Sequence, residues 1–184
     1  MSRRLLAVAL LATVMVMSVL VSPSQASGLP GKKKWLKDTR SAMSGSRAYV
    51  RERVQRGGTR LAVNFDIDNT ALASRYSSGS AVPVVLRFAK YASSLGVKLV
   101  FNTGRNENGL ARAVEELRRA GYPVTAICGH RKGEPLRTSK QRCRQKFVDD
   151  GYTIIANVGN RSTDFVGGNY ERAFRLPNYH NRLA

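Results

Sequence analysis

Two carboxylates, Asp66 and Asp68, stand two residues apart directly after the short apolar run 61–65. An apolar run of this length predicts a buried strand, so both carboxylates follow the end of a strand. Two anions held this close repel each other, and a divalent cation offsets that repulsion. The donors are oxygens without histidine or thiol, a set that suits Mg²⁺ better than Zn²⁺. The spacing therefore predicts a magnesium site at the end of a strand.

Further candidate residues lie near two later strand-like runs. Thr103 and Gly104 follow the run 97–101, and Asn160 and Asp164 follow the run 153–158. Lys140 lies early in the helix-like segment that precedes the second of these runs. In an open α/β sheet, ligands bind beyond the carboxyl ends of the strands, so these residues are expected to converge on one edge. A threonine hydroxyl beside backbone amides suits a phosphoryl oxygen, and a lysine supplies positive charge. The chemistry that this set predicts is phosphoryl transfer.

Strand-like and helix-like segments alternate along the chain. Apolar runs predict strands at 61–65, 97–101, 124–128 and 153–158. Helical spacing predicts helices at 81–95, 109–120 and 138–150, the last with Thr138 and Ser139 as N-cap candidates. The earlier segment 35–54 is loosely helical and is interrupted at Ser44-Gly45-Ser46. This alternation predicts an α/β fold, a Rossmann-like parallel sheet with helices on both faces.

Five segments resemble sequence motifs of one phosphatase family. Phe65-Asp66-Ile67-Asp68-Asn69-Thr70 resembles the first motif, D-x-D-x-T, of the haloacid dehalogenase (HAD) superfamily, and Asn102-Thr103-Gly104-Arg105 is similar to the second. Lys140, followed by Arg144 and Lys146-Phe147, stands at the third motif as in the acid-phosphatase branch (class B, subfamily IIIB). The run 157–165 resembles the fourth motif, G-D-x-x-x-D, and 172–178 resembles the branch's closing R-x-F-K-L-P-N. The resemblance implies one HAD-like phosphatase domain over 35–184.

The resemblance also implies a role for each matching residue. Asp66 would be the nucleophile that forms an aspartyl-phosphate, and Asp68 would protonate the leaving oxygen and then activate water. Thr103, with the amides beside Gly104, and Lys140 would hold the phosphoryl group and balance its charge. Mg²⁺ would be held by Asp66, by the Asp68 backbone carbonyl and by the fourth motif, through Asn160 and Asp164.

Two departures from the family pattern affect this expectation. Asn160 stands where the family usually has the first Asp of the fourth motif, so the metal site loses one negative charge and its affinity should fall. Only residues 71–80 separate the first motif from the next helix, so the cap that covers the site in capped relatives is minimal or absent. An open site favours a bulky or polymeric phosphoester, or closure by a partner subunit in an oligomer.

The first 26 residues have the pattern of an export signal. Arg3 and Arg4 precede an apolar run over 5–21, and Ser24-Gln25-Ala26 resembles a cleavage site. The alternative is an uncleaved membrane anchor, because the run has the minimum length for a span. The sequence therefore predicts a signal peptide over 1–26, a flexible basic arm over 27–34, and a secreted or extracytoplasmic protein without a membrane span after cleavage.

Two cysteines, Cys128 and Cys143, suit an oxidising location. They either form a disulfide that closes a loop of about 15 residues or remain buried or free thiols, and the sequence leaves both open. His130 and His180 lie too far apart in sequence to suggest a zinc site.

The basic charge predicts attraction to anions in general. The chain has 31 Lys+Arg against 12 Asp+Glu, a formal charge of +19. No nucleic-acid-binding motif accompanies this charge, so non-specific polyanion binding is expected and specific nucleic-acid readout is not. Two functions remain: an exported, Mg²⁺-dependent phosphomonoesterase, or a catalytically weak HAD scaffold that binds anionic partners. The intact residues at positions 66, 68, 103 and 140 favour the enzyme, and Asn160 favours the scaffold.

Overall fold

The computed structural model describes residues 28–183 and contains one five-stranded parallel sheet of strand order β3-β2-β1-β4-β5. The strands are β1 (Leu61–Phe65), β2 (Lys98–Asn106), β3 (Ala126–His130), β4 (Thr153–Gly159) and β5 (Arg172–Arg175). The chain runs outward from β1 through β2 to β3 and then crosses to β4 on the other side of β1. The strand order thus reverses between β1 and β4, and ligands bind outside such a reversal point.

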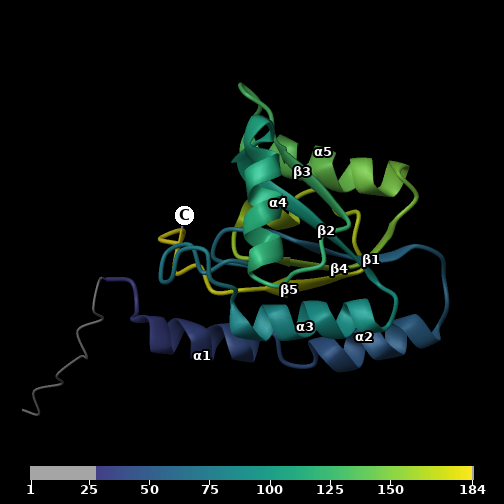
Figure 1. Ribbon diagram of the computed structural model, residues 1–184, viewed down its shortest axis with the longest axis horizontal. Coiled ribbons are helices and arrows are strands. Elements are labelled where there is room, and N and C mark those ends of the chain that lie inside the picture. Colours follow the sequence, from purple (N-terminus) through teal and green to yellow (C-terminus); the bar gives the residue numbers. More distant parts are fainter. Residues whose placement is uncertain (1–27, 184) are drawn as a thin grey trace, which may run out of the picture.

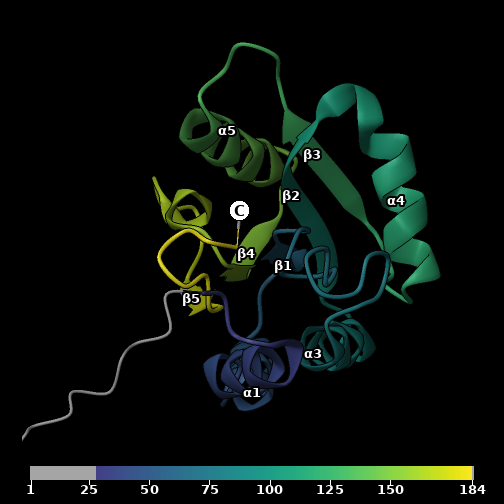
Figure 2. The same ribbon diagram turned by 90° about the vertical axis from the view of Figure 1, so that its left-hand side faces the viewer.

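Helices cover both faces of the sheet, as predicted. They are α1 (Lys32–Ala42), α2 (Ser46–Gln55), α3 (Pro83–Ser94), α4 (Leu110–Arg119) and α5 (Leu136–Asp149), with short 3-10 helices η1 (Glu107–Gly109) and η2 (Ser162–Phe165). Figure 1 shows α2 and α3 along one face and α5 along the other, and Figure 2 shows the same layers from the side. The sequence prediction of an α/β parallel sheet is therefore confirmed.

Alternate side chains of each strand point to the two opposite faces of the sheet and pack into a separate core on each. Val63 and Phe65 of β1 pack into the larger core with side chains of the first four helices. Ala62 lies in the second core, under Cys143 and Phe147 of α5. Successive strand side chains point to opposite faces, so a strand covered on both sides must be apolar at nearly every position. This explains why all five residues of β1 are buried.

One polar pair inside the sheet connects it to the loop after β4. Asn64 Nδ2 of β1 donates to Asn157 Oδ1 of β4 at 2.6 Å, and Asn157 Nδ2 donates to the carbonyl of Asp164 at 2.8 Å. Both amides are buried, and a buried polar group is costly unless it is hydrogen-bonded. The pair therefore fixes the position of η2 relative to the strands.

Three details differ from the sequence expectations. The helix α1 begins at Lys32, so the expected flexible arm 27–34 is already helical at its last three residues. The helix α5 begins at Leu136 with Pro135 before it, not at Thr138 or Ser139, and the buried Ser139 hydroxyl donates to the Gly129 carbonyl. The strand β5 was not expected because it has only four residues, although its Phe174 is buried in the core.

The interrupted helix expected over 35–54 is confirmed as α1 and α2. Gly45 separates them with a φ of 74°, a left-handed conformation that favours glycine. The predicted signal peptide 1–26 lies outside the described residues. Within residues 28–183, no helix has the length and apolar composition needed to cross a bilayer.

The two cysteines, left open by the sequence, form a disulfide. Cys128 in the middle of β3 is bonded to Cys143 of α5, 15 residues later. Both lie in the core between the sheet and α5. The bond ties α5 to the sheet about one helical turn after Lys140.

Candidate functional site

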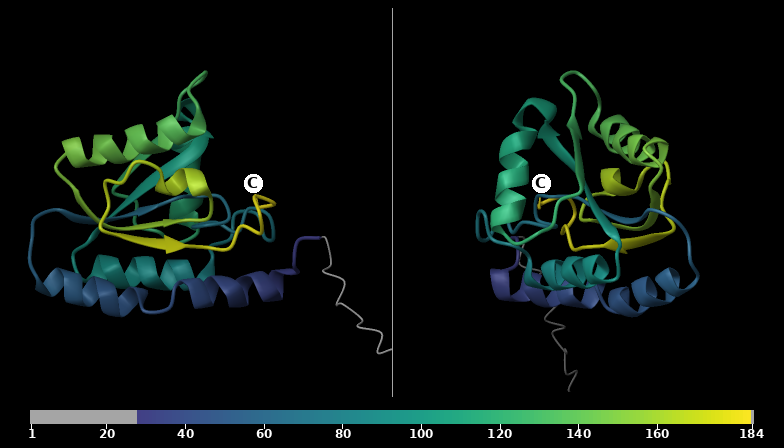
Figure 3. Two further views of the ribbon diagram at one scale, coloured as in Figure 1. Left: turned by 180° about the vertical axis from the view of Figure 1, so that it is seen from behind. Right: turned by 45° about the vertical axis from the view of Figure 1, so that its right-hand side comes forward.

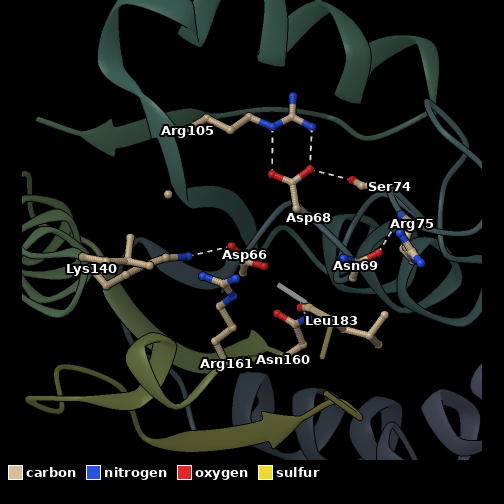
Figure 4. A pocket seen from close by; sticks show the side chains of 12 residues that line it. Asp66, Asp68, Asn69, Ser74, Arg75, Arg105, Lys140, Asn160, Arg161 and Leu183 are labelled. Carbon is tan, nitrogen blue, oxygen red and sulfur yellow. Dashed lines mark hydrogen bonds and ion pairs between the residues drawn. The ribbon is translucent and has the colours of Figure 1, made fainter. Parts of the chain in front are cut away.

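The carboxyl ends of β1, β2 and β4 border a cavity of about 460 Å³ (Figure 4). Five of the predicted site residues line it, and they are Asp66, Asp68, Gly104, Lys140 and Asn160. Thr103 and Asp164 are buried directly behind the lining residues. The structure thus brings together on one edge all seven residues that the sequence analysis selected.

Lys140 is the centre of a buried cluster of ion pairs. Its Nζ lies 2.6 Å from Asp66 Oδ1 and 2.7 Å from Asp164 Oδ1, and it donates to the Asn102 carbonyl at 2.7 Å. In return, Asn102 Nδ2 donates to the Lys140 carbonyl at 2.7 Å. The Lys140 side chain is only 2% exposed. This ammonium therefore contacts oxygens of three segments, Asp66 and Asn102 through hydrogen bonds and Asp164 through an ion pair, and is held in a single position.

The cluster has an unbalanced charge, because two carboxylates share one ammonium. Burial raises the pKa of Asp66 to about 6, and the nearby charge of Asp164 adds to this effect although Lys140 opposes it. Burial alone would lower the pKa of Lys140, but Asp66 and Asp164 outweigh it and hold that pKa above its usual value. The ammonium stays charged, and the remaining negative charge attracts a further cation.

Asp68 is held by a different set of donors. Arg105 Nε lies 2.9 Å from Asp68 Oδ2, Arg105 Nη2 lies 2.7 Å from Oδ1, and the Ser74 hydroxyl donates to Oδ1 at 2.5 Å. Arg105 also pairs with Glu116 of α4 at 2.7 Å. Burial would raise the pKa of Asp68, but the bonds from Arg105 and Ser74 outweigh it, so that pKa lies below its usual value.

Gly104 of β2 lines the cavity, and Thr103 is buried behind it. Thr103 is buried, and its hydroxyl accepts from the backbone N–H of Arg105 at 3.1 Å. Gly104 lines the cavity, and a Cβ at this position would meet Leu136 Cδ1 at 3.1 Å. A larger residue would therefore crowd Leu136, while glycine leaves its backbone open toward the cavity. A role for the Thr103 hydroxyl in holding phosphate stays a prediction.

Asp164 stabilises the loop after β4 in addition to its contact with Lys140. Its Oδ2 accepts from the backbone N–H groups of Asn160 at 3.0 Å and Arg161 at 2.8 Å. A Cβ at Gly159 would lie 2.5 Å from the same oxygen, so only glycine fits there. Both carboxylate oxygens of Asp164 thus already have protein partners. Its predicted role as a metal ligand stays a prediction, and its visible role is to position Lys140 and residue 160.

Arg144, which the sequence analysis noted only as part of a motif, holds the same loop from α5. Its guanidinium donates to the carbonyls of Asp164, Val166 and Gly168. Buried carbonyls need donors, and one arginine supplies three of them here. The loop that contains Asp164 therefore depends on α5 at two points, Lys140 and Arg144.

The residues of the cavity can accommodate a cation. Asn160 Oδ1 is buried in the cavity wall and has no hydrogen-bond partner among the described residues. Lys140 contacts only Oδ1 of Asp66, which leaves the other oxygen of this carboxylate without a protein donor in the part of the chain that the structure describes. No three His, Cys, Asp or Glu side chains gather as a metal cluster within residues 28–183. The set of Asp66 and Asn160 oxygens fits a hard cation such as Mg²⁺.

Sequence reasoning missed several residues of the cavity. Arg105 was part of a quoted motif, but its pairing with Asp68 requires knowledge of where β2 lies. Arg75, Arg161 and Leu183 also line the cavity. Charge and spacing near the first and fourth motifs could have indicated the two arginines, whereas no sequence signal indicates that Leu183 reaches the site.

Comparisons with known proteins identify the family of the chain. A family model described as HAD superfamily, subfamily IIIB (Acid phosphatase), matches residues 75–182, which contain motifs two to four. The chain is 30% identical over 98 residues to Acid phosphatase 1 of Solanum lycopersicum, covering 50% of the chain and 38% of the relative. It is 30% identical over 105 residues to the Stem 28 kDa glycoprotein of Glycine max, covering 53% and 41%. The chain thus spans about two fifths of the length of these curated relatives.

A solved structure has the same fold. The Class C acid phosphatase from Bacillus anthracis superimposes with a TM-score of 0.65 at 16% sequence identity, covering 80% of this chain and 79% of that chain.

The raised pKa of Asp66 makes its charge costly in the metal-free protein. Its folded-state pKa is about 6 against an ordinary value of 3.8, so the cost is absent below about pH 4 and complete above about pH 6. We expect Asp66→Asn to raise the melting temperature in EDTA at neutral pH but not at pH 4. The rise should be several degrees, since about 1 kcal/mol corresponds to about 2–4 °C in a domain of this size.

The matched control is Glu115→Gln, which removes an exposed carboxylate of α4. It should leave the melting temperature unchanged at both pH values. A lower melting temperature for Asp66→Asn at neutral pH would contradict the charge balance described for the Lys140 cluster.

Proposed function

Because the chain belongs to subfamily IIIB of the HAD superfamily, the acid phosphatases, we propose that it hydrolyses phosphomonoesters through an aspartyl-phosphate on Asp66. The observation that carries this proposal is the buried contact between Lys140 Nζ and Asp66 Oδ1 at the edge of a cavity. A carboxylate held at the end of β1 beside a fixed ammonium suits nucleophilic attack on a phosphoryl group.

The proposed reaction has two steps. In the first, an Asp66 oxygen forms a bond to phosphorus, the bond from phosphorus to the ester oxygen breaks, and Asp68 gives that oxygen its proton. In the second, Asp68 takes a proton from water, the water oxygen attacks phosphorus, and inorganic phosphate leaves while the Asp66 carboxylate is restored. The second step returns the proton to Asp68, so the complete cycle consumes only the phosphomonoester and one water molecule.

The surrounding residues would stabilise the transferred group. The charge of Lys140 and the amides beside Gly104 face the place where phosphoryl oxygens would lie. A divalent cation, Mg²⁺ in this proposal, would be held by Asp66, the Asp68 carbonyl and Asn160, with Asp164 behind them. When bound, it supplies positive charge against the phosphoryl oxygens.

The environment of Asp68 favours catalysis at acidic pH. The bonds from Arg105 and Ser74 lower the pKa of Asp68, so its carboxylate is ionised in the resting protein. Protonation of a leaving group requires the neutral acid, whose population grows as the pH falls. An acidic optimum is therefore the expected consequence of the Arg105 pair.

The open cavity supports a bulky or polymeric phosphoester as substrate. The loop over 71–80 is short, closed by the bond from Ala73 N–H to the Ser80 carbonyl, and contributes only Ser74 and Arg75 to the lining. Arg161 lines the cavity from the loop after β4. These arginines and the formal charge of +19 favour anionic substrates and non-specific polyanion binding. We also propose that a second subunit of an oligomer could cover the open side of the cavity.

Export is also part of the proposal. It rests on the pattern of residues 1–26 and agrees with a disulfide between Cys128 and Cys143, because disulfides persist in oxidising compartments. The second candidate function is the catalytically weak scaffold that binds anions. The observation that favours it is Asn160, a neutral residue at a metal-binding position.

Hydrolysis of p-nitrophenyl phosphate tests the choice between these functions. We expect turnover that rises with Mg²⁺ and falls at least about 1000-fold in Asp66→Asn, since this change removes the proposed nucleophile. The control Glu115→Gln should retain full activity. Turnover of the unsubstituted protein that does not exceed the Asp66→Asn background at any Mg²⁺ concentration would favour the scaffold.

The Arg105 pair predicts a specific change in pH dependence. Arg105→Gln removes the bonds that lower the pKa of Asp68, so its pKa should rise and the neutral acid should persist to higher pH. We therefore expect the optimum of kcat to move to higher pH. Arg112→Gln is the matched control, because Arg112 pairs with Glu116 at 3.3 Å but is not bonded to Asp68. An unchanged optimum, or one at lower pH, would contradict the role of Arg105.

A further inference from the structure

The side-chain amide of Asn160 has a defined orientation. Its Nδ2 donates to the backbone carbonyl of Leu183 at 3.1 Å, while its Oδ1 is buried and has no protein partner in the described chain. Both residues line the cavity, and Figure 4 shows them next to each other below Asp66. A carbonyl can accept only from a donor, so the contact with Leu183 requires the NH₂ group on that side. The oxygen is thereby left for the cavity.

The chain makes an unusual turn to bring Leu183 to this place. Tyr179, His180 and Asn181 have φ values of 51°, 59° and 65°. The left-handed region is uncommon for residues other than glycine, and three such residues in succession are costly. The turn is held by the bond from Asn181 N–H to Asn178 Oδ1 at 2.6 Å and by the Tyr179 hydroxyl, which donates to Asp38 of α1 at 2.7 Å.

The segment 178–183 ends with Leu183 almost completely buried, at 1% exposure. Figure 3 shows this end of the chain beside the loop that follows β1, at the edge of the sheet where the strands end. The Leu183 N–H also donates to the Asn178 carbonyl at 3.2 Å. A strained turn that several contacts maintain, and whose last carbonyl contacts a cavity residue, points to a function for that carbonyl.

We propose that the Leu183 carbonyl is a positioning group for the cation site, since it aims the Asn160 oxygen into the cavity. The proposal rests on the cation site of the proposed function. A carboxylate has an oxygen on either side and can ligate a cation in both orientations. An amide has an oxygen on one side and a donor on the other, and the donor repels a cation. An asparagine at this position therefore needs an acceptor for its NH₂ group on the side away from the cation, and an aspartate does not need one.

This requirement joins two features that were separate in the sequence. The replacement of the family's aspartate by Asn160 removes a negative charge. The turn over 179–181 places a carbonyl that accepts from the Asn160 NH₂ group, a bond that an aspartate carboxylate could not make. The two features together keep an oxygen ligand at this position.

A double-mutant cycle tests the proposal through metal binding. Four proteins are compared: the full chain, a chain that ends at Arg182, and both again with Asn160→Asp. The rise of the melting temperature on addition of Mg²⁺ alone, or Mn²⁺ alone, gives the dissociation constant of the metal without any assay of activity. We expect truncation to weaken metal binding about three- to tenfold with Asn160, which is the value of one hydrogen bond. In the Asn160→Asp background, truncation should change metal binding less than about twofold.

Two controls accompany the cycle. A chain that ends at Leu183 keeps an oxygen acceptor at this position, as a terminal carboxylate, and should bind metal at least as tightly as the full chain does. Glu115→Gln, which changes an exposed residue of α4 outside the cavity, should leave the metal affinity unchanged. If the chain that ends at Arg182 does not fold, Asn178→Ala is the replacement, because it removes the Oδ1 that accepts from Asn181 N–H and keeps the backbone carbonyl that accepts from Leu183. Its effect on metal binding should then depend in the same way on whether residue 160 is Asn or Asp.

Equal weakening by truncation in both backgrounds would overturn the proposal, because the segment would then act only by packing. No effect of truncation in either background would also overturn it, as would the absence of metal-dependent stabilisation in the full chain. The proposed function can fail separately. If the cycle gives the expected coupling but p-nitrophenyl phosphate is not hydrolysed, the cation site exists without the phosphatase activity.

Discussion

The buried ammonium of Lys140 is the contact on which the site depends. It joins Asp66 at the end of β1, Asp164 in η2 and the Asn102 carbonyl of β2. A buried charge is tolerated only when it is paired and hydrogen-bonded, so these contacts must form together. The cluster of two carboxylates and one ammonium retains a net negative charge. Its excess charge destabilises the metal-free protein and is also the feature that attracts a cation, so stability and function oppose each other here.

The rest of the fold keeps this cluster in place. The disulfide between Cys128 and Cys143 fixes α5 against the sheet just after Lys140, and Arg144 binds the loop of Asp164 from the same helix. From within the sheet, the pair of Asn64 and Asn157 reaches the same loop. Each of these polar contacts is buried and would be costly if left unpaired. The helix α5, whose Cys143 and Phe147 pack with strand residues in the second core, is thus also the element that sets the geometry of the site.

The sequence predicts the parts of this arrangement that depend on local pattern. Buried strands need apolar runs, and motif residues follow those runs, so the positions of Asp66, Asp68, Thr103 and Lys140 at one edge were predictable. The contacts that depend on tertiary packing were not. The pairing of Arg105 with Asp68 requires two strands to lie side by side, and β5 is too short to have a recognisable pattern. The start of α5 was misplaced because Thr138 and Ser139 resemble N-caps, while Pro135, without an N–H, stands at the actual start. The approach of Leu183 to Asn160 depends on a turn formed by non-glycine residues with positive φ, which sequence patterns do not indicate.

The central claim is that Asp66, fixed by Lys140, is the nucleophile of a phosphoryl transfer. The most direct measurement is to quench the protein with acid during turnover of a phosphomonoester and to locate phosphate by mass spectrometry of its peptides. We expect a phosphorylated peptide that contains Asp66, with the phosphate on that residue and absent from Asp66→Asn. Steady turnover without any phosphorylated peptide, or with phosphate on another residue, would show that Asp66 is not the nucleophile.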